Sequence, residues 1–239
     1  FKKKPIVYLR SDGYGEYKAI LGFFGPAIYH LMFSLVSKIS PLISCREYIL
    51  RKKKGKIVAP SQINSQWLKQ PKEHKFNEPK LLYVGRIRKE KGIYSLLSLL
   101  KENKTNLTLS IVGAEKNSPT LIAQNGVNMY EVENNEQNLI KFYDDHNIFI
   151  LPSYTEGHPM VLLEALSRLR PVIIFKDIEH VIGDKKGIFV ANRTLGSFLE
   201  QINYIKKNYQ TIQQDMKKNK LPTKEEFLLK FSSLISELS

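Results

Sequence analysis

Residues 148–165 read IFILPSYTEGHPMVLLEA, and this stretch decides the fold. The apolar run at 148–151 predicts a short buried strand, bounded by Pro152 and Ser153. The apolar residues of 160–168 predict a helix, and Pro159 suits its first turn. A strand, a loop and a helix in this order form part of a βαβ unit.

The same alternation extends from residue 80 to residue 220. The further strands that we expect lie at 81–84, 107–112, 127–130, 172–175 and 188–190, and the further helices lie at 93–100, 136–145 and 195–207. Short apolar strands alternating with helices predict an α/β fold with a parallel sheet covered on both faces. Ligands of such sheets bind where the strands end and the helices begin.

The part before residue 80 has a different pattern. We expect a strand at 5–9, a turn at 11–15, a short strand at 56–59 and a helix at 62–69 capped by Ser61. The polar segment 71–79 has prolines at both ends and predicts a linker. The predicted organisation is therefore an N-terminal domain at 1–70, the linker at 71–79, a second domain at 80–220, and a C-terminal helix at 221–239 that packs back on the N-terminal domain. Because the chain starts with Phe1, we expect it to begin inside a domain.

A long apolar stretch covers residues 20–36. Its 17 residues lie at the lower limit for crossing a bilayer, and Pro26, His30 and the nearby Lys38 argue against a span. Two interpretations stay open: one or two helices that pack on a sheet, or a helix that lies against one membrane surface.

The net charge of +14 is unevenly distributed. Residues 1–80 contain 16 Lys and Arg against 5 Asp and Glu, whereas residues 81–239 contain 21 against 18. The basic N-terminal part indicates either a solvated surface or a surface that faces anionic lipid or a phosphorylated acceptor. Nucleic acid is disfavoured because no RNA- or DNA-binding motif accompanies the charge. The single cysteine, Cys45, excludes an intramolecular disulfide and indicates a reducing compartment.

Two junctions between a strand and a helix contain polar residues suited to a nucleotide sugar. Gly85 and Arg86 follow one strand, and Lys91 and Gly92 come just before the next helix. Glycines let the backbone approach a ligand, while arginine and lysine suit a diphosphate. The alternative is a basic surface loop.

The second junction contains Glu156 in the loop and Glu164 on the helix. Ionised carboxylates bind the vicinal hydroxyls of sugars and ribose. The alternative makes Glu156 a turn residue and Glu164 a charge on the helix surface, and the spacing alone does not decide between them.

Together these junctions resemble the retaining glycosyltransferases of the GT-B fold, in family four of the usual grouping (glycosyl transferases group 1). Glu156 and Glu164 resemble its Glu-x7-Glu signature, Gly85 to Gly92 its phosphate site, and Gly113 the strand end near the nucleobase. The resemblance covers residues 57–239 well and 5–56 faintly. It implies a Rossmann-like C-terminal domain at 80–220 that binds the nucleotide sugar, with part of a second Rossmann-like domain at 1–70, the remainder of an acceptor domain.

The resemblance implies a role for each matching residue. Arg86 and Lys91 would neutralise the donor diphosphate, Glu156 would contact the transferred sugar, and Glu164 would bind the ribose. Asp12 stands near the position of a histidine that contacts the sugar in the family. The expected catalytic residues are Glu156, Arg86 and Lys91, and the expected substrate-binding residues are Glu164, Gly85, Gly113, Gly157, His158, Pro159, Met160, Val161, Tyr130 and Asp12.

The activity implied is transfer of a sugar, with retention of configuration, from a nucleotide-diphosphate sugar to a glycan or lipid-linked acceptor in polysaccharide biosynthesis. No cofactor or metal is expected, because Arg86 and Lys91 balance the charge. We expect a cytoplasmic protein, peripheral at the inner face of the membrane. The alternatives are a non-catalytic basic module with a transferase-like fold and a GT-B sugar-nucleotide epimerase.

Three departures from the family pattern stand out. Leu169 occupies a helix end where the family usually has glycine, which suits a left-handed backbone. His158 replaces a phenylalanine beside the sugar, where we expect it to line the pocket. The glycine-rich loop of the N-terminal domain has no counterpart.

Overall fold

The computed structural model describes residues 5–73, 76–101, 107–114 and 126–238. The chain forms two compact units. Unit 1 contains Phe1–Asn64, Thr155–Met160 and Pro222–Ser239, and unit 2 contains Ser65–Tyr154 and Val161–Leu221. The predicted linker and domain boundaries stay predictions.

Unit 2 is built on a parallel sheet. Among the described residues it has six strands in the order β6-β5-β4-β7-β8-β9, and every neighbouring pair is parallel. The strands are β4 (Lys80–Val84), β5 (Thr108–Ala114), β6 (Val127–Glu131), β7 (Ile148–Leu151), β8 (Val172–Phe175) and β9 (Ile188–Ala191). The prediction of an α/β fold with a parallel sheet is confirmed.

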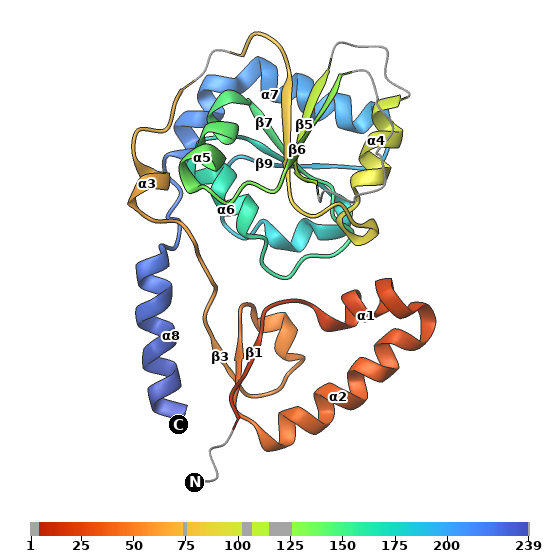
Figure 1. The fold of residues 1–239 in the computed structure, drawn as a ribbon, viewed down its shortest axis with the longest axis vertical. Coiled ribbons are helices and arrows are strands. Elements are labelled where there is room, and N and C mark those ends of the chain that lie inside the picture. Colours follow the sequence, from red (N-terminus) through yellow and green to blue (C-terminus); the bar gives the residue numbers. More distant parts are fainter. Residues whose placement is uncertain (1–4, 74–75, 102–106, 115–125, 239) are drawn as a thin grey trace. The chain divides into compact units, whose positions relative to one another are not determined.

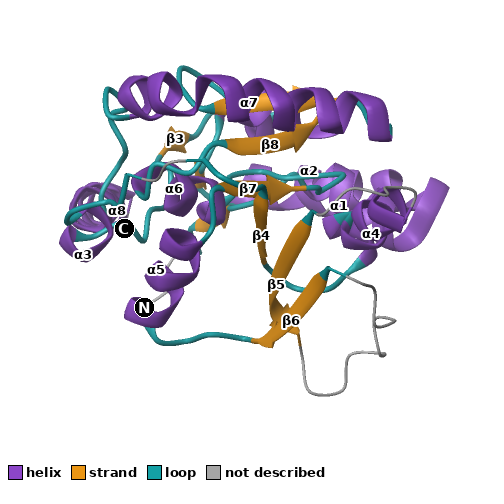
Figure 2. Ribbon diagram, turned by 90° about the horizontal axis from the view of Figure 1, so that it is seen from above, coloured by secondary structure: helices purple, strands orange, loops and turns teal. Residues whose placement is uncertain are grey.

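Helices cover the sheet because its central strands are apolar on both faces. All the residues of β7 and β8 are buried, as the continuous apolar runs predicted. Figures 1 and 2 both show α5 and α6 on one side of the sheet and α4 on the other. The helical elements of unit 2 are α3 (Ser65–Leu68), η3 (Lys89–Lys91), α4 (Ile93–Lys101), α5 (Glu136–Asp145), α6 (Met160–Ser167), η4 (Lys176–Val181) and α7 (Leu195–Met216). The first residue of α6, Met160, is assigned to unit 1.

Two of these helices differ in length from the prediction. Helix α7 continues beyond residue 207 to Met216, because Tyr209, Ile212 and Met216 extend its buried face past a kink at Asn208. The helix expected at 62–69 is reduced to the four residues of α3. Ser61 does not cap that helix; within unit 1 its hydroxyl donates to the Pro222 carbonyl and accepts from the Ile63 amide.

Helix α6 ends in the left-handed turn that the sequence indicated. Leu169 has φ of 56°, its amide donates to the Leu166 carbonyl, and the Arg170 amide donates to the Ala165 carbonyl at 2.9 Å. These two bonds define a Schellman motif. The left-handed conformation costs a residue with a Cβ about 1–2 kcal/mol. Leu169 is buried, and burial of a leucine contributes about 1.5–3 kcal/mol, which offsets that strain.

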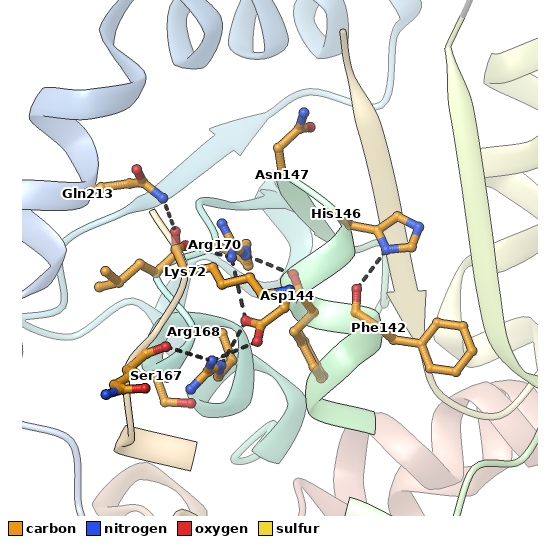
Figure 3. A network of polar contacts seen from close by, with 12 residues as sticks. Lys72, Phe142, Asp144, His146, Asn147, Ser167, Arg168, Arg170 and Gln213 are labelled. Atoms are coloured by element: carbon orange, nitrogen blue, oxygen red, sulfur yellow. Dashed lines mark hydrogen bonds and ion pairs between the residues drawn. The ribbon is translucent and has the colours of Figure 1, made fainter. Parts of the chain in front are cut away.

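A buried charge network joins α5 to the end of α6 (Figure 3). Arg168 donates from Nε and Nη2 to the two carboxylate oxygens of Asp144, at 2.9 and 2.7 Å. Arg170 lies 3.5 Å from the same carboxylate and donates to the Tyr143 carbonyl. One carboxylate thus serves two arginines, and carbonyl oxygens take up further guanidinium donors, as buried charges require.

The same arginines hold the chain that enters unit 2. Nη1 of Arg168 donates to the carbonyls of Trp67 and Lys69, and Nη2 of Arg170 donates to the carbonyl of Lys72. Further along, the Asn147 amide donates to the Glu78 carbonyl. The segments on both sides of residues 74–75 are therefore hydrogen-bonded to the rest of unit 2 by the side chains of Asn147, Arg168 and Arg170.

Unit 1 contains a smaller parallel sheet with helices around it. The described strands lie in the order β1-β2-β3. The elements are β1 (Val7–Leu9), α1 (Gly13–Leu21), η1 (Gly22–Phe24), α2 (Gly25–Ile39), β2 (Leu42–Ser44), η2 (Glu47–Leu50), β3 (Lys56–Ile57) and α8 (Lys224–Leu238). Helix α8 packs Phe227 and Phe231 against Tyr8 of β1.

The predicted turn at 11–15 is wrong after Asp12, because α1 already begins at Gly13. The Glu16 amide donates to the Asp12 carbonyl and closes the first turn of this helix. Glycine is required at this helix start, since a Cβ on Gly13 would lie 2.0 Å from the ring of Tyr29. The close approach of α1 to α2, which no local pattern predicts, therefore requires glycine at the start of α1.

Helices α1 and α2 form a hairpin (residues 13–39), with η1 at its tip (Figure 1). By length and composition alone, Gly13–Ile39 is long and apolar enough to cross a membrane. However, the chain reverses at η1, and the rings of Tyr14 and Tyr17 pack against Tyr29. Its two arms have 9 and 15 residues, and each is shorter than the roughly 20 residues of a spanning helix.

Candidate functional site

The ends of β4 and β5 meet at two glycines in unit 2. Gly113 has φ of 122°, and a Cβ on it would lie 2.3 Å from the carbonyl oxygen of Gly85. Gly85 has φ of 152° and donates its amide to the Val112 carbonyl. Both positions therefore require glycine, and the structure brings together two of the strand ends that the sequence singled out.

The basic residues follow directly after β4. Arg86 is exposed, and its carbonyl accepts a hydrogen bond from the Tyr83 hydroxyl at 2.8 Å. Lys91 is half-buried at the end of η3. The left-handed Gly92 then redirects the chain into α4. This loop is attached to the end of β7, since the Tyr154 amide donates to the Glu90 carbonyl at 2.9 Å.

Glu164 is a buried carboxylate on α6, in contrast to the interpretation that makes it a charge on the helix surface. Glu164 is 5% exposed, and one of its carboxylate oxygens accepts a hydrogen bond from the Tyr143 hydroxyl at 2.8 Å. Burial raises the pKa of Glu164 to about 7, although the bond from Tyr143 opposes this shift. No lysine, arginine or histidine is ion-paired with it in the described part of the chain.

Glu156 and its neighbours belong to unit 1. The Glu156 carbonyl accepts from the Tyr48 hydroxyl at 3.0 Å, and a Cβ on Gly157 would lie 2.7 Å from the Cα of Ser11. The loop thus packs closely on Arg10 and Ser11, which follow β1. His158 shares a hydrogen bond with the Pro60 carbonyl through Nε2 at 2.9 Å. Asp12 is ion-paired with Arg51 at 3.3 Å.

The remaining predicted residues lie in the loop before α6, on α6 itself and on β6. Pro159 is buried, and Met160 and Val161 form the first turn of α6 and are half-buried. Tyr130 is exposed on β6 and packs its ring on Phe142, with 4.8 Å between centroids. Within the described ranges, no group of three or more His, Cys, Asp or Glu side chains is arranged to hold a metal ion.

Two residues that we did not predict hold the predicted ones in place. Tyr143, which is fully buried on α5, holds the Glu164 carboxylate. Arg193 donates to the carbonyls of Pro152 and Ser153 at the end of β7. Neither position carries a local signal, because each contacts its partner across at least 20 residues of sequence.

The parallel sheet, with its glycine turns at the strand ends, places this chain in the GT-B class of folds. The chain belongs to the glycosyl transferases group 1 family, whose family model matches residues 65–221.

Relatives and solved structures agree with this family. The chain is 34% identical over 92 residues to the putative teichuronic acid biosynthesis glycosyltransferase TuaC of Bacillus subtilis (strain 168), a match that covers 38% of this chain. It is 28% identical over 137 residues to the capsular polysaccharide biosynthesis glycosyltransferase CapM of Staphylococcus aureus, covering 50% of this chain. These matches span only 23% and 34% of the two relatives.

The structure of Anabaena Alr3699/HepE in complex with UDP and glucose has the same fold. Its TM-score is 0.72 at 13% identity, with 98% of this chain and 71% of that chain covered.

Proposed function

We propose that the protein is a retaining glycosyltransferase that moves a sugar from a nucleotide-diphosphate sugar to a glycan or lipid-linked acceptor. The observation that carries this proposal is Glu164, a buried carboxylate without a cationic partner among the described residues. Such a group destabilises a fold and is characteristic of a functional site. The hydroxyls of a ribose are donors that suit it.

The other side chains suit the rest of the donor. Arg86 and Lys91 neutralise the diphosphate, and the backbone amides near residues 158–161 add donors to it. Glu156 contacts the transferred sugar. These groups position the donor and stabilise the charge of the departing diphosphate, so no metal is needed for charge balance.

The proposed reaction needs no protein nucleophile. The acceptor oxygen forms a bond to the anomeric carbon on the face from which the diphosphate departs, and the bond from that carbon to the phosphate oxygen breaks. The acceptor proton passes to the departing diphosphate. Configuration is retained because attack and departure use the same face.

Donor binding is tested by thermal unfolding with UDP-, GDP- and ADP-sugars. We expect one nucleotide class to raise the melting temperature. Ligand at 100 times its Kd stabilises by about 2.7 kcal/mol, or about 5–10 °C for a protein of this size. The absence of any shift with all three classes would contradict the proposal.

Product analysis by NMR with the responsive donor and candidate glycan acceptors then tests the reaction. A transferred sugar of unchanged anomeric configuration supports it, whereas an epimerised nucleotide sugar indicates the alternative activity of this fold. Binding without either product would indicate a non-catalytic module.

We also propose that unit 1 contacts an anionic membrane surface through the tip of the hairpin, which suits a cytoplasmic protein peripheral at the inner face. Phe23 and Phe24 at the tip are 90% and 71% exposed, and the hairpin also exposes Ile20, Leu31 and Leu35. A contiguous apolar surface of this kind is characteristic of a membrane or protein contact. The basic run Arg51 to Lys54 supplies charge that complements anionic headgroups, and Arg51 lies 4.9 Å from the ring of Tyr14 in the hairpin.

Vesicle flotation tests this contact. We expect the protein to float with phosphatidylglycerol vesicles, and the double variant Phe23→Ser/Phe24→Ser to lose at least tenfold in binding, since each buried phenylalanine contributes about 1.5–3 kcal/mol. The matched control is Leu228→Ser/Leu229→Ser, which removes two exposed apolar residues of α8 in the same unit. Equal losses in both variants, or flotation with neutral vesicles alone, would contradict a specific role of the tip.

A further inference from the structure

Arg193 connects several loops at the carboxyl end of the sheet in unit 2. It lies between β9 and α7. Its Nη2 donates to two successive carbonyls, those of Pro152 at 2.8 Å and Ser153 at 2.9 Å. Its Nε donates to a carboxylate oxygen of Asp177 at 2.8 Å. The side chain is 18% exposed. A planar guanidinium with three partners in fixed directions has one orientation.

Two aromatic rings fix this orientation further. The guanidinium carbon lies 3.8 Å from the ring centroid of Tyr154 and 4.5 Å from that of Phe175. Cation–π contacts of this kind favour a flat guanidinium against the ring, a geometry that lysine does not reproduce. Arg193 therefore holds Pro152, Ser153 and Tyr154 together, which are the three residues before Thr155 and Glu156.

The phosphate loop meets the same point. A Cβ on Gly92 would lie 1.8 Å from the carbonyl oxygen of Pro152 and 3.3 Å from Nη1 of Arg193. The Tyr154 amide also donates to the Glu90 carbonyl. The loop that contains Lys91 thus packs on the Pro152 carbonyl, which Arg193 orients. That carbonyl belongs to the segment that leads to Glu156.

We infer that Arg193 is a positioning residue of the donor site, which fixes the Pro152–Tyr154 segment and, through it, the loop of Lys91. This inference rests on the proposed function, because it assigns importance to Lys91 and Glu156. Arg193 is not a catalytic residue: its Nη1 is buried, and its other nitrogens bond to protein oxygens.

Arg193→Lys and Arg193→Gln, compared with the unaltered chain, test this role. We expect kcat to fall about 100-fold in both, because displacing a reacting group by about 1 Å can reduce turnover by that factor. Affinity for the nucleoside diphosphate alone, measured by calorimetry, is expected to fall about tenfold because the loop of Lys91 shifts. This loss is smaller than the loss of kcat, since that ligand lacks the sugar that Glu156 contacts. A purely structural role would lower both quantities in proportion to the folded fraction, which thermal unfolding reports.

Two further variants keep the test decisive if those of Arg193 do not fold. Tyr154→Leu removes a stacking ring while leaving the carbonyl contacts, and we expect kcat to fall at least tenfold. The matched control is Glu179→Gln, which removes a carboxylate of η4 that is ion-paired with Lys176 and not with Arg193, so kcat should stay within threefold. Unchanged kcat in folded variants of Arg193 and Tyr154 would overturn the inference, whereas failure of the unaltered chain to bind any nucleotide would overturn the proposed function instead.

Discussion

Glu164→Gln is expected to make the protein more stable at pH 8 and at the same time weaken nucleotide binding. Burial raises the pKa of Glu164 from 4.5 to about 7, so the folded state holds a proton that the unfolded state releases. The stability associated with this proton is complete below pH 4.5 and is lost as the pH rises to 7. The loss amounts to about 3 kcal/mol, since one pH unit corresponds to 1.36 kcal/mol. Glutamine is neutral at every pH, so the free energy of unfolding of the variant does not decrease in this way.

The effect on binding has the opposite sign. A hydrogen bond to a charged group contributes about 1.5–3 kcal/mol, so loss of the carboxylate is expected to weaken nucleotide binding by about 10- to 100-fold at pH 8. Because the ligand favours the ionised form, affinity of the unaltered protein should rise between pH 5 and 7 and then level. The variant has no carboxylate to ionise at position 164, so its affinity should not show this rise.

Urea unfolding and calorimetry at pH 5 and pH 8 measure both effects. The matched control is Glu200→Gln, which removes an exposed carboxylate of α7 in the same unit and should leave both quantities within experimental scatter. A variant of Glu164 that is no more stable than the unaltered chain at pH 8 would contradict the buried ionisation. A variant that binds nucleotide normally would contradict the ribose contact.

Gly92→Ala is expected to destabilise unit 2 by about 3 kcal/mol or more. Two costs add, about 1–2 kcal/mol for a Cβ at φ of 67° and about 1–3 kcal/mol for overpacking. The new methyl would lie 1.8 Å from the Pro152 carbonyl oxygen. That oxygen cannot easily move, because it accepts from Arg193 and follows the buried strand β7. The loop of Lys91 must shift instead, so we also expect nucleotide affinity to fall at least tenfold.

Gly196→Ala is the matched control for this substitution. Gly196 lies in the first turn of α7, and a Cβ there meets no atom within 4 Å. Alanine at this helical position is expected to raise stability by about 0.5–1 kcal/mol. Thermal and urea unfolding of both variants should therefore give shifts of opposite sign, and equal stability of Gly92→Ala and the unaltered chain would contradict the packing described above.

The sequence by itself was enough to predict the local structure of unit 2. The strands β7 and β8 and the helix α5 have the predicted bounds, because apolar periodicity and helix caps act within a few residues. The left-handed end of α6 at Leu169 was indicated by the resemblance, because the family usually has glycine at this position. Arg86, Lys91 and the two glutamates could be singled out because each follows a recognisable strand.

Only the tertiary structure decided the surroundings of these residues. Tyr143 reaches Glu164 across 21 positions and Arg193 reaches Pro152 across 41, distances over which no local pattern operates. The reversal of the apolar stretch at η1 depends on packing between α1 and α2, which the continuous apolar composition concealed. Local chemistry therefore determined which residues stand at the strand ends. Long-range packing decided which of them is buried, which is strained and which is fixed in place, because burial and hydrogen bonding are properties of the folded environment.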